Sequence, residues 1–597
     1  MCGIFYLSGA SQLGEVTLRK AVSSLESLSY RGPDNCEYKL YQGAFIGHTR
    51  LSIVDLDAGA NQPFVSNDKR YVITYNGEIY NHKELRSILM DQGASLATSS
   101  DTEVVLELFR LKGAEAFSML RGMYAVVIYD TETGVTHVAT DQIGKKPLFW
   151  AIWDDLLIIA SSVDAIARFI PDLNVDPDAL SILFHPRLRS LYPPYTPFQE
   201  IRRFEPGIYE TFKAAEKLHA EPIVYRYPEG EDVGRSIRDA ITLRTQADVP
   251  VASLLSGGMD SAVIAQLASR YQDLTCLTIG RDAQDPDVIA SQSVASVLGV
   301  KHTILFEDGD ETYTEFTKLV EASGDYVPLM NLAHLSSLFK RVRESGIKCV
   351  LTGNGADELF FGYRSIKTYS KLFPLLNLIP SWSRRLDLGV WFLAPNGLRR
   401  AKYFGNLYED SIGVFDEAST RSKIFSDIGA KLKVEEPCTI EEEVILSSFF
   451  FENHHSLAMA SDLPAMVNSV EARSPFMDIH VLSGARRLTL KNDYKTSKGS
   501  IHTKLPVFNL LSKHTKEAIL KIKTGLGASL GERERIISWK DEYLQLCKAS
   551  SYKFGALENS DFLAAWGKFE NGGLSAGTIL KLFNVLILRA KYNEKLR

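Results

Sequence analysis

The segment Val249-Pro-Val-Ala-Ser-Leu-Leu255-Ser-Gly-Gly-Met-Asp-Ser261 sets the architecture of the second half of this 597-residue chain. Its apolar start predicts a buried strand, its glycine pair a tight turn, and the residues from Ser261 to Tyr271 a helix. The alternation continues with strands predicted at Thr275–Ile279 and Cys349–Thr352 and helices at Val288–Leu298 and Leu332–Glu344. Alternating strands and helices favour a parallel sheet with helices on both faces.

The turn Ser256–Ser261 is a candidate phosphate site. Glycines let the backbone approach a ligand, and a helix that begins just after a strand offers unpaired N–H groups. The sequence lacks G-x-x-x-x-G-K-[ST], so the turn is not a Walker A loop. Taken alone, a Gly-Gly turn before a helix is weak evidence, and an ordinary structural turn remains the alternative.

The first half of the chain has a different pattern of predicted strands and helices. Short apolar or alternating runs predict strands at Ile4–Leu7, Phe45–Val54, Tyr71–Tyr75, Met123–Tyr129, Val135–Ala139 and Leu156–Ala160. Helical periodicity is confined to Thr17–Leu28 and Thr102–Lys112. Many strands with few helices favour packed antiparallel sheets with helices outside. The polar segment Ala214–Gly230 predicts a linker, so we expect one domain at 1–213 and another at 230–597.

Composition narrows the class of protein. Hydrophobic residues make up 45% and charged residues 23%, which is typical of a globular protein with large cores. The net charge of -6 argues against a dedicated nucleic-acid binder. Six scattered cysteines without a C-x-x-C pair suit a reducing compartment, and neither a signal-like start nor an apolar run of about 18 residues is present. We therefore expect a cytoplasmic protein with no membrane and no nucleic-acid partner.

Cys2 directly follows the initiator methionine. Removal of that methionine would leave a thiol and a free α-amine on one residue, and an amine with a pKa of about 8 can take the thiol proton. A cysteine at this place can also be an accident of sequence. Four motifs downstream favour a function: Arg31-Gly-Pro-Asp34, His48-Thr-Arg-Leu-Ser-Ile-Val-Asp55, Asn76-Gly-Glu-Ile-Tyr-Asn81 and Ser100-Asp-Thr-Glu103.

With Met1-Cys-Gly-Ile4, these motifs resemble the class II glutamine amidotransferase domain, an N-terminal-nucleophile hydrolase with an αββα sandwich. The resemblance implies Cys2 as nucleophile, Arg50 on the α-carboxylate of glutamine, and Glu78 and Asp101 on its α-ammonium. A planar guanidinium fork suits a carboxylate, and a buried cation needs carboxylate partners. The resemblance further implies a pocket wall of Leu51, Ser52, Ile53 and Val54 and an oxyanion hole of Asn76 and Gly77. Loss of one oxyanion donor typically costs about 3 kcal/mol of barrier, although an Asn-Gly pair alone is more often a hairpin turn.

The phosphate turn resembles the pyrophosphate-binding motif of ATP pyrophosphatases, which cleave ATP between the α- and β-phosphates. With Thr352-Gly-Asn-Gly-Ala-Asp-Glu358 and Val470-Glu-Ala-Arg-Ser-Pro-Phe-Met-Asp478, the resemblance extends over nearly the full chain to the glutamine-hydrolysing asparagine synthetase family. It implies a second, parallel α/β domain with a helical insert at about 365–456. The implied cofactors are ATP and Mg²⁺, a cation that prefers oxygen ligands and phosphates. The implied ATP site comprises Leu254, Ser256, Gly257, Gly258, Met259, Asp260, Ser261, Ile279, Asp287, Thr352 and Gly353.

The implied metal ligands are Asp260 and Asp357. Lys504 matches, loosely, the family's lysine that stabilises the adenylate transition state, and the nearby Lys521 is more typical of a surface charge. The implied reaction transfers ammonia from glutamine to a carboxylate that ATP has adenylated, with aspartate as the default acceptor and AMP and pyrophosphate as products. Because free ammonia is protonated in water, we expect a water-poor passage between the two sites. The resemblance also admits a homodimer.

Three features on the expected acceptor side depart from the family pattern. Asn354 replaces an acidic residue, Leu463 follows Asp462 where the family usually has Arg or Lys, and Asp325–Asn331 lacks the Thr-Thr-x-Arg of some members. One alternative is therefore the same chemistry on another carboxylate, as in amidation or cyclisation of a peptide, saccharide or specialised metabolite. A second is a catalytically silent relative that serves as a binding subunit, against which the intact site residues argue.

Overall fold

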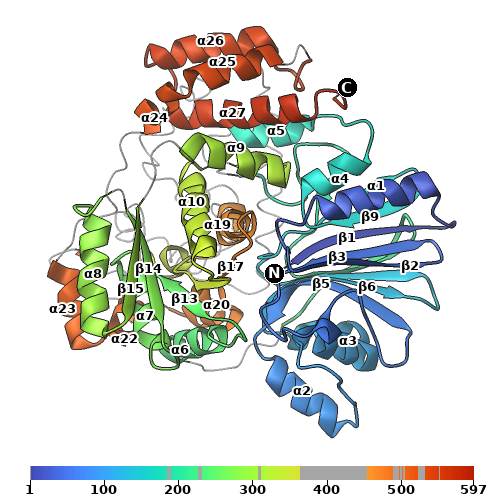
Figure 1. Ribbon diagram of the computed structural model, residues 1–597, viewed down its shortest axis with the longest axis horizontal. Coiled ribbons are helices and arrows are strands. Elements are labelled where there is room, and N and C mark those ends of the chain that lie inside the picture. The colour runs from blue at the N-terminus through green and yellow to red at the C-terminus, as the bar shows by residue number, and fades with distance from the viewer. Residues whose placement is uncertain are drawn as a thin grey trace, which may run out of the picture.

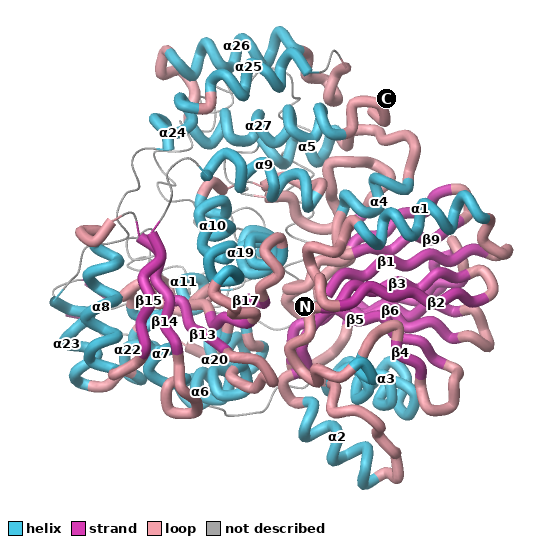
Figure 2. Tube along the Cα trace, viewed as in Figure 1, coloured by secondary structure: helices cyan, strands magenta, loops and turns pink. Residues whose placement is uncertain are grey.

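The computed structural model describes residues 2–184, 190–225, 232–280, 282–306, 311–327, 329–362, 445, 454–488, 496–497, 500–501, 504–521, 532–549 and 552–596. The first half contains two β-sheets packed face to face, and the second half contains a parallel sheet between helices (Figure 1). Figure 2 shows the strands gathered in these two regions. Among the described residues, no helix combines the length and the apolar character that crossing a bilayer requires.

The first half is the predicted αββα sandwich. One sheet has the strand order β10-β8-β9-β1-β3-β2 and the other β12-β11-β7-β6-β5-β4, and their strands pair antiparallel. Helix α1 packs on the first sheet and α3 on the second. The strands are β1 (Cys2–Gly9), β2 (Asn35–Tyr41), β3 (Ala44–Arg50), β4 (Phe64–Val65), β5 (Tyr71–Ile79), β6 (Gly122–Asp130), β7 (Val135–Thr140), β8 (Phe149–Trp153), β9 (Leu156–Ala160), β10 (Arg202–Arg203), β11 (Ile208–Lys213) and β12 (Glu216–Pro222). The helices are α1 (Glu15–Glu26), α2 (His82–Asp91), α3 (Asp101–Lys112), α4 (Val163–Phe169) and α5 (Pro177–Phe184).

Alternating side chains on β1 explain why this strand lies at the centre of its sheet. Ile4 and Tyr6 face the second sheet and join the core between the sheets, while Phe5 and Leu7 face α1 and join another core cluster. Successive residues of a strand point to opposite faces, so a strand that is apolar at every position is covered on both sides. The first residues of the chain are therefore held firmly between two layers.

The prediction of a linker from Ala214 is wrong for residues 216–222, which form β12 at the edge of the second sheet. Its side chains are exposed throughout, and charged residues are common on edge strands. An exposed edge strand and a linker thus have the same polar composition. The strand predicted at Phe45–Val54 also ends earlier, at Arg50.

The second half has a five-stranded sheet in the order β15-β14-β13-β16-β17, and all its pairs are parallel, as predicted. Helices α6, α7 and α8 share one core cluster on one face, and α10 and α19 contribute to another core cluster on the other. The strands are β13 (Val251–Leu254), β14 (Thr275–Gly280), β15 (Lys301–Phe306), β16 (Cys349–Leu351) and β17 (Glu471–Arg473). The described helices between residues 233 and 521 are α6 (Val233–Arg244), α7 (Met259–Ala268), α8 (Pro286–Leu298), α9 (Thr312–Ser323), α10 (Asn331–Glu344), α11 (Ala356–Leu359), α19 (His454–Met466), α20 (Ile479–Arg486), α22 (Leu505–Leu510) and α23 (Lys513–Lys521).

The last helices of the chain pack back onto the first half. Helices α24 (Glu532–Ser538), α25 (Lys540–Ala549), α26 (Asn559–Glu570) and α27 (Ala576–Lys591) form a cap with α5 and α9 (Figure 1). The Tyr592 hydroxyl donates to Asp164 Oδ1 of α4 at 2.8 Å. This cap ties the two ends of the chain together. The predicted helical insert at about 365–456 lies almost wholly outside the described residues.

Candidate active sites

Cys2, the first residue of β1, lines a pocket of about 370 Å³. Eight of the predicted glutaminase residues line this pocket: Cys2, Arg50, Leu51, Ile53, Val54, Gly77, Glu78 and Asp101. Sequence reasoning missed further lining residues, among them Gln62, Tyr75, Ser100 and Thr102. Ser100 and Thr102 belong to the motif Ser100-Asp-Thr-Glu103, so both had a signal in the sequence. Ser52 does not line the pocket, because its backbone N–H turns to Asp34 Oδ2 at 2.8 Å.

A hydrogen bond orients the Asn76 side chain so that its amide N–H can donate to a developing anion. The Cys2 backbone nitrogen donates to Asn76 Oδ1 at 3.0 Å, while Asn76 Nδ2 is buried and has no hydrogen-bond partner among the described residues. A buried donor without a partner costs about 1–3 kcal/mol. A free N–H beside a nucleophilic sulfur is the arrangement that an oxyanion hole requires.

Charged groups on the pocket wall are fixed by hydrogen bonds with surrounding backbone and side-chain groups. The Arg50 guanidinium donates to Asp57 O at 3.0 Å and to Asn61 Oδ1 at 2.6 Å. Asp101 Oδ2 accepts from the Tyr75 hydroxyl at 2.8 Å and from the Ile79 N–H at 2.9 Å. The Arg50 guanidinium and the Asp101 carboxylate therefore lie in one pocket. Such a pair suits the α-carboxylate and the α-ammonium of an amino acid.

Glu78 has a partner from the other half of the chain. Its Oε2 lies 3.1 Å from Nη2 of Arg473, whose Nε donates to Glu471 Oε1 at 2.5 Å. Burial raises the pKa of Glu78 well above its usual range, although Arg473 opposes the rise. An incoming ammonium would favour the ionised carboxylate again.

The Cys2 thiol is buried yet acidic. Burial by itself raises its pKa, but the charge of His48 and further local interactions outweigh this and lower the pKa to about 6. A thiolate is the nucleophilic form of cysteine, so a lowered pKa favours reaction near neutral pH.

The predicted nucleotide residues gather at the carboxyl edge of the parallel sheet. Leu254, Ile279 and Thr352 lie at or just after the ends of β13, β14 and β16, where ligands bind in open α/β sheets. Gly257 has φ +68°, and a Cβ there would come within 2.3 Å of Ala290 on α8. The turn before α7 therefore requires glycine, and it lies against the helix whose first turn carries the predicted Asp287.

Lys504 joins the two predicted metal ligands. Its Nζ lies 2.5 Å from Asp260 Oδ2 and 2.6 Å from Asp357 Oδ1. Burial raises the pKa of Asp260 although Lys504 opposes the rise, and Asp260 Oδ1 is buried without a partner among the described residues. Two carboxylates that share one cation and leave an oxygen free fit the oxygen donor set of Mg²⁺. Lys521 is the last residue of α23, and its side chain lies outside the part of the chain that the structure describes.

Comparisons with known proteins identify the family of each half. Residues 1–223 match the family described as glutamine amidotransferase domain, and residues 232–508 match the family described as asparagine synthase. The chain belongs to the glutamine-hydrolysing asparagine synthetase family. It is 29% identical to asparagine synthetase [glutamine-hydrolyzing] 1 of Bacillus subtilis, over 80% of this chain and 78% of that protein. It is 28% identical to a putative asparagine synthetase [glutamine-hydrolyzing] of Mycobacterium tuberculosis, over 82% of each chain.

Among solved structures, glutamine phosphoribosylpyrophosphate amidotransferase from B. subtilis matches with a TM-score of 0.30 and 16% identity, covering 59% of this chain and 82% of that one. The membership in the synthetase family makes this chain a carbon–nitrogen ligase of the amidotransferase type.

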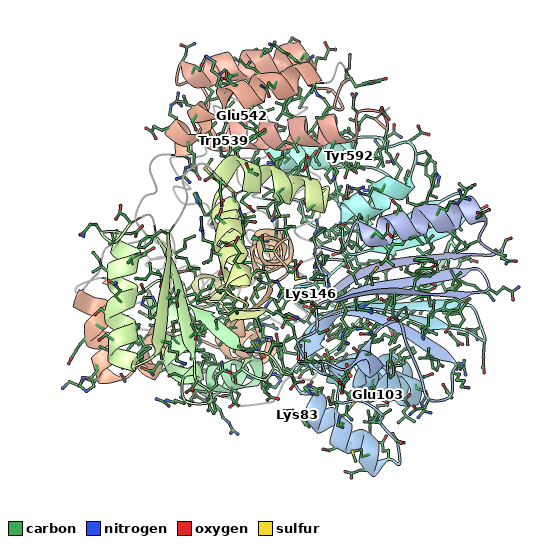
Figure 3. All side chains as sticks on the ribbon, viewed as in Figure 1. Lys83, Glu103, Lys146, Trp539, Glu542 and Tyr592 are labelled. Atoms are coloured by element: carbon green, nitrogen blue, oxygen red, sulfur yellow. The ribbon has the colours of Figure 1, made fainter. Side chains whose placement is uncertain are left out.

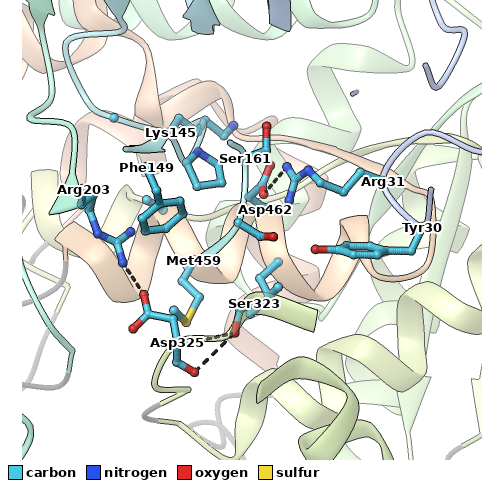
Figure 4. Close-up of a pocket in the computed structure, with 15 residues that line it drawn as sticks. Tyr30, Arg31, Lys145, Phe149, Ser161, Arg203, Ser323, Asp325, Met459 and Asp462 are labelled. Carbon is cyan, nitrogen blue, oxygen red and sulfur yellow. Dashed lines mark hydrogen bonds and ion pairs between the residues drawn. The ribbon is translucent and has the colours of Figure 1, made fainter. Parts of the chain in front are cut away.

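The features that depart from the family pattern lie close to the contact between the halves. Asn354 Nδ2 donates to Ser461 Oγ at 3.3 Å on α19. Leu463, on the same helix, lines a cavity of about 460 Å³ together with Arg31 and Asp325 (Figure 4). Asp325 is bound there by Arg203 of the first half. Leu463 and Asp325 thus lie at the interface between the two halves, whereas the hydrogen bond of Asn354 stays within the second half.

Buried ion pairs hold this interface together. Asp462 accepts from Arg31 Nη2 at 2.7 Å and from Lys146 Nζ at 3.1 Å, and Figure 3 shows Lys146 between the two halves. Asp478 pairs with Arg121 of the first half at 3.0 Å. No local pattern predicted these pairs, because their members lie hundreds of residues apart.

Proposed function

We propose that this synthetase converts aspartate to asparagine, with glutamine as nitrogen donor and with ATP cleaved to AMP and pyrophosphate. The observation that carries the proposal is the pocket in which Cys2 stands beside Arg50, Glu78 and Asp101. It offers one nucleophile and the charges that a free amino acid requires. The relatives named asparagine synthetase support aspartate as acceptor. Cytoplasmic location and a homodimer remain predictions.

The pocket supports a thioester mechanism for the first reaction. Arg50 would bind the α-carboxylate of glutamine, and Glu78 and Asp101 its α-ammonium. The Cys2 thiolate attacks the side-chain amide carbon, and the oxyanion receives hydrogen bonds from Asn76 Nδ2 and the Gly77 N–H. Ammonia leaves, and water hydrolyses the glutamyl thioester. In the prediction from the sequence, the Cys2 α-amine acts as base after removal of the initiator methionine.

The second reaction would take place at the edge of the parallel sheet. The Ser256–Ser261 turn would bind the phosphates of ATP through its backbone and the start of α7. Asp260 and Asp357 would hold Mg²⁺, which supplies neutralisation of phosphate charge. The aspartate side-chain carboxylate attacks the α-phosphate and expels pyrophosphate. Lys504 stabilises the charge that develops on the phosphates, and ammonia then displaces AMP.

A product assay tests the proposal. Purified full-length protein is expected to form asparagine and pyrophosphate in equal amounts from aspartate, ATP and glutamine, and also from ammonium in place of glutamine. Cys2→Ala is expected to abolish the glutamine-dependent reaction and to keep the ammonium-dependent one. Pyrophosphate release with another carboxylic acid but not with aspartate would overturn the choice of acceptor.

A further inference from the structure

Arg473 reaches from the second half of the chain to the wall of the glutamine pocket. It ends β17, where it pairs with Leu351 of β16, and its side chain is fully buried. Its Nη2 lies 3.1 Å from Oε2 of Glu78, which lines the pocket. Nη2 makes no hydrogen bond to any other group among the described residues, so Glu78 is its one close partner there. A cation of the second half therefore supports a carboxylate of the first half's pocket.

The remaining donors of Arg473 fix its guanidinium in this position. Nη1 donates to the carbonyl oxygen of Arg244 at 3.1 Å and to that of Gln246 at 2.6 Å. Nε donates to Glu471 Oε1 at 2.5 Å. Turning the guanidinium away from Glu78 would break these bonds in a place that water does not reach, and buried donors without partners are unfavourable. The cation is thus set in place before any ligand arrives.

Burial and neighbouring carboxylates act against a negative charge on Glu78. Burial raises its pKa most, and the charges of Asp101 and Glu471 raise it further. Arg473 is the largest influence that lowers this pKa, and the α-amino group of the chain adds to it. Burial also raises the pKa values of the uncharged neighbours, which are Tyr75, Tyr80 and Cys349. Among the described residues, Arg473 is the only cation in ion-pair contact with Glu78.

A buried carboxylate at this place suits a ligand that brings a cation of its own. The α-ammonium of glutamine is such a cation, and Glu78 would then lie between two positive charges, with Arg473 on one side and the ligand on the other. Opposite charge nearby favours the ionised form of a carboxyl group. An ionised Glu78 attracts the ammonium, whereas a neutral carboxyl group gives up most of that attraction.

We propose that Arg473 is a positioning residue of the glutaminase site, which the second half supplies to hold Glu78 against the α-ammonium of glutamine. The inference rests on the proposed function and deepens it, because it assigns the selection of a free amino acid to a contact between the halves. Arg473 acts through Glu78 and does not touch the substrate. The Glu78–Arg473 pair should therefore discriminate glutamine from glutaramate, which is glutamine without its α-ammonium.

Binding of these two ligands tests the proposal. The full-length Cys2→Ala protein binds without turnover, and isothermal titration calorimetry gives its Kd for glutamine and for glutaramate. In this background we expect glutamine to bind more tightly than glutaramate by roughly tenfold or more. Adding Arg473→Gln should weaken glutamine binding by roughly tenfold and change glutaramate binding by less than about twofold. Arg473→Lys keeps a cation and should recover most of the affinity for glutamine.

Arg121→Gln is the matched control. Arg121 also joins the halves, through Asp478 at 3.0 Å, but it does not line the pocket, so both Kd values should stay unchanged. If Arg473→Gln does not fold, the double variant Glu471→Gln/Arg473→Gln is measured, since it removes one charge of each sign. Equal weakening of both ligands, or equal losses in the Gln and Lys variants of Arg473, would overturn the proposal. No glutamine binding in the Cys2→Ala protein would overturn the proposed function, and the inference with it.

Discussion

Asp462→Asn should weaken the contact between the two halves and disturb the nucleophile at the same time. The carboxylate is 2% exposed and belongs to α19 of the second half. It binds Arg31 and Lys146 of the first half at 2.7 Å and 3.1 Å. Arg31 also donates from Nε to the Cys2 carbonyl oxygen at 3.0 Å. The side chain that supports the nucleophile's backbone is therefore anchored by the other half of the molecule.

The size of the effect follows from burial. The side chains of Arg31 and Lys146 are 2% and 0% exposed, so water reaches neither cation. Asp462→Asn therefore leaves both cations buried without the negative charge that they share. Removing one partner of a buried pair costs about 3–5 kcal/mol. With a urea dependence of roughly 3 kcal/mol per molar, the urea midpoint of unfolding should fall by about 1–1.7 M.

Urea unfolding, monitored by tryptophan fluorescence, measures this shift in midpoint. A separate assay of the glutaminase rate measures the effect on the nucleophile. Lys348→Met is the matched control, because Lys348 also joins the halves, at 2.7 Å to Asp34, but both side chains are about one quarter exposed. An exposed pair of this kind contributes about 0–1 kcal/mol. Equal midpoints for Asp462→Asn and Lys348→Met would refute the reasoning.

Three further predictions concern catalysis and pH. Asn76→Ala should lower the glutaminase kcat by about 10²–10³-fold while ammonium-dependent synthesis is retained, and an equal loss in both assays would contradict the oxyanion role. Lys504→Met should abolish pyrophosphate release but leave glutamine hydrolysis intact, as a coupled phosphate assay and a glutamate assay would show. Burial raises the pKa of Asp478, but Arg121 and Arg244 outweigh it and hold the pKa below its usual range. Its stabilisation is therefore present above about pH 4 and lost as the pH falls further, so Asp478→Asn should narrow the difference in unfolding midpoint between pH 7 and pH 3.

Local motifs revealed most of the chemistry because each motif lies within one turn or one strand end. Asn76-Gly77 and the turn at Ser256–Ser261 each consist of consecutive residues, so the sequence shows them directly, and the family resemblance predicts their roles. The pairing of Glu78 with Arg473 left no such trace, since the partners come from different sheets. Edge strand β12 was mistaken for a linker because exposure, and not flexibility, gives it a polar composition.

The sequence by itself predicted the two fold classes, and its motifs predicted the nucleophile and the residues of both candidate sites, since periodicity and short motifs are properties of neighbouring residues. Only the tertiary structure decided how the two sites are joined. It placed Lys504 between Asp260 and Asp357 and buried Asp462 between two cations of the other half. Each of these depends on contacts between distant segments, and the free energy of such contacts is set by burial, which no local pattern records.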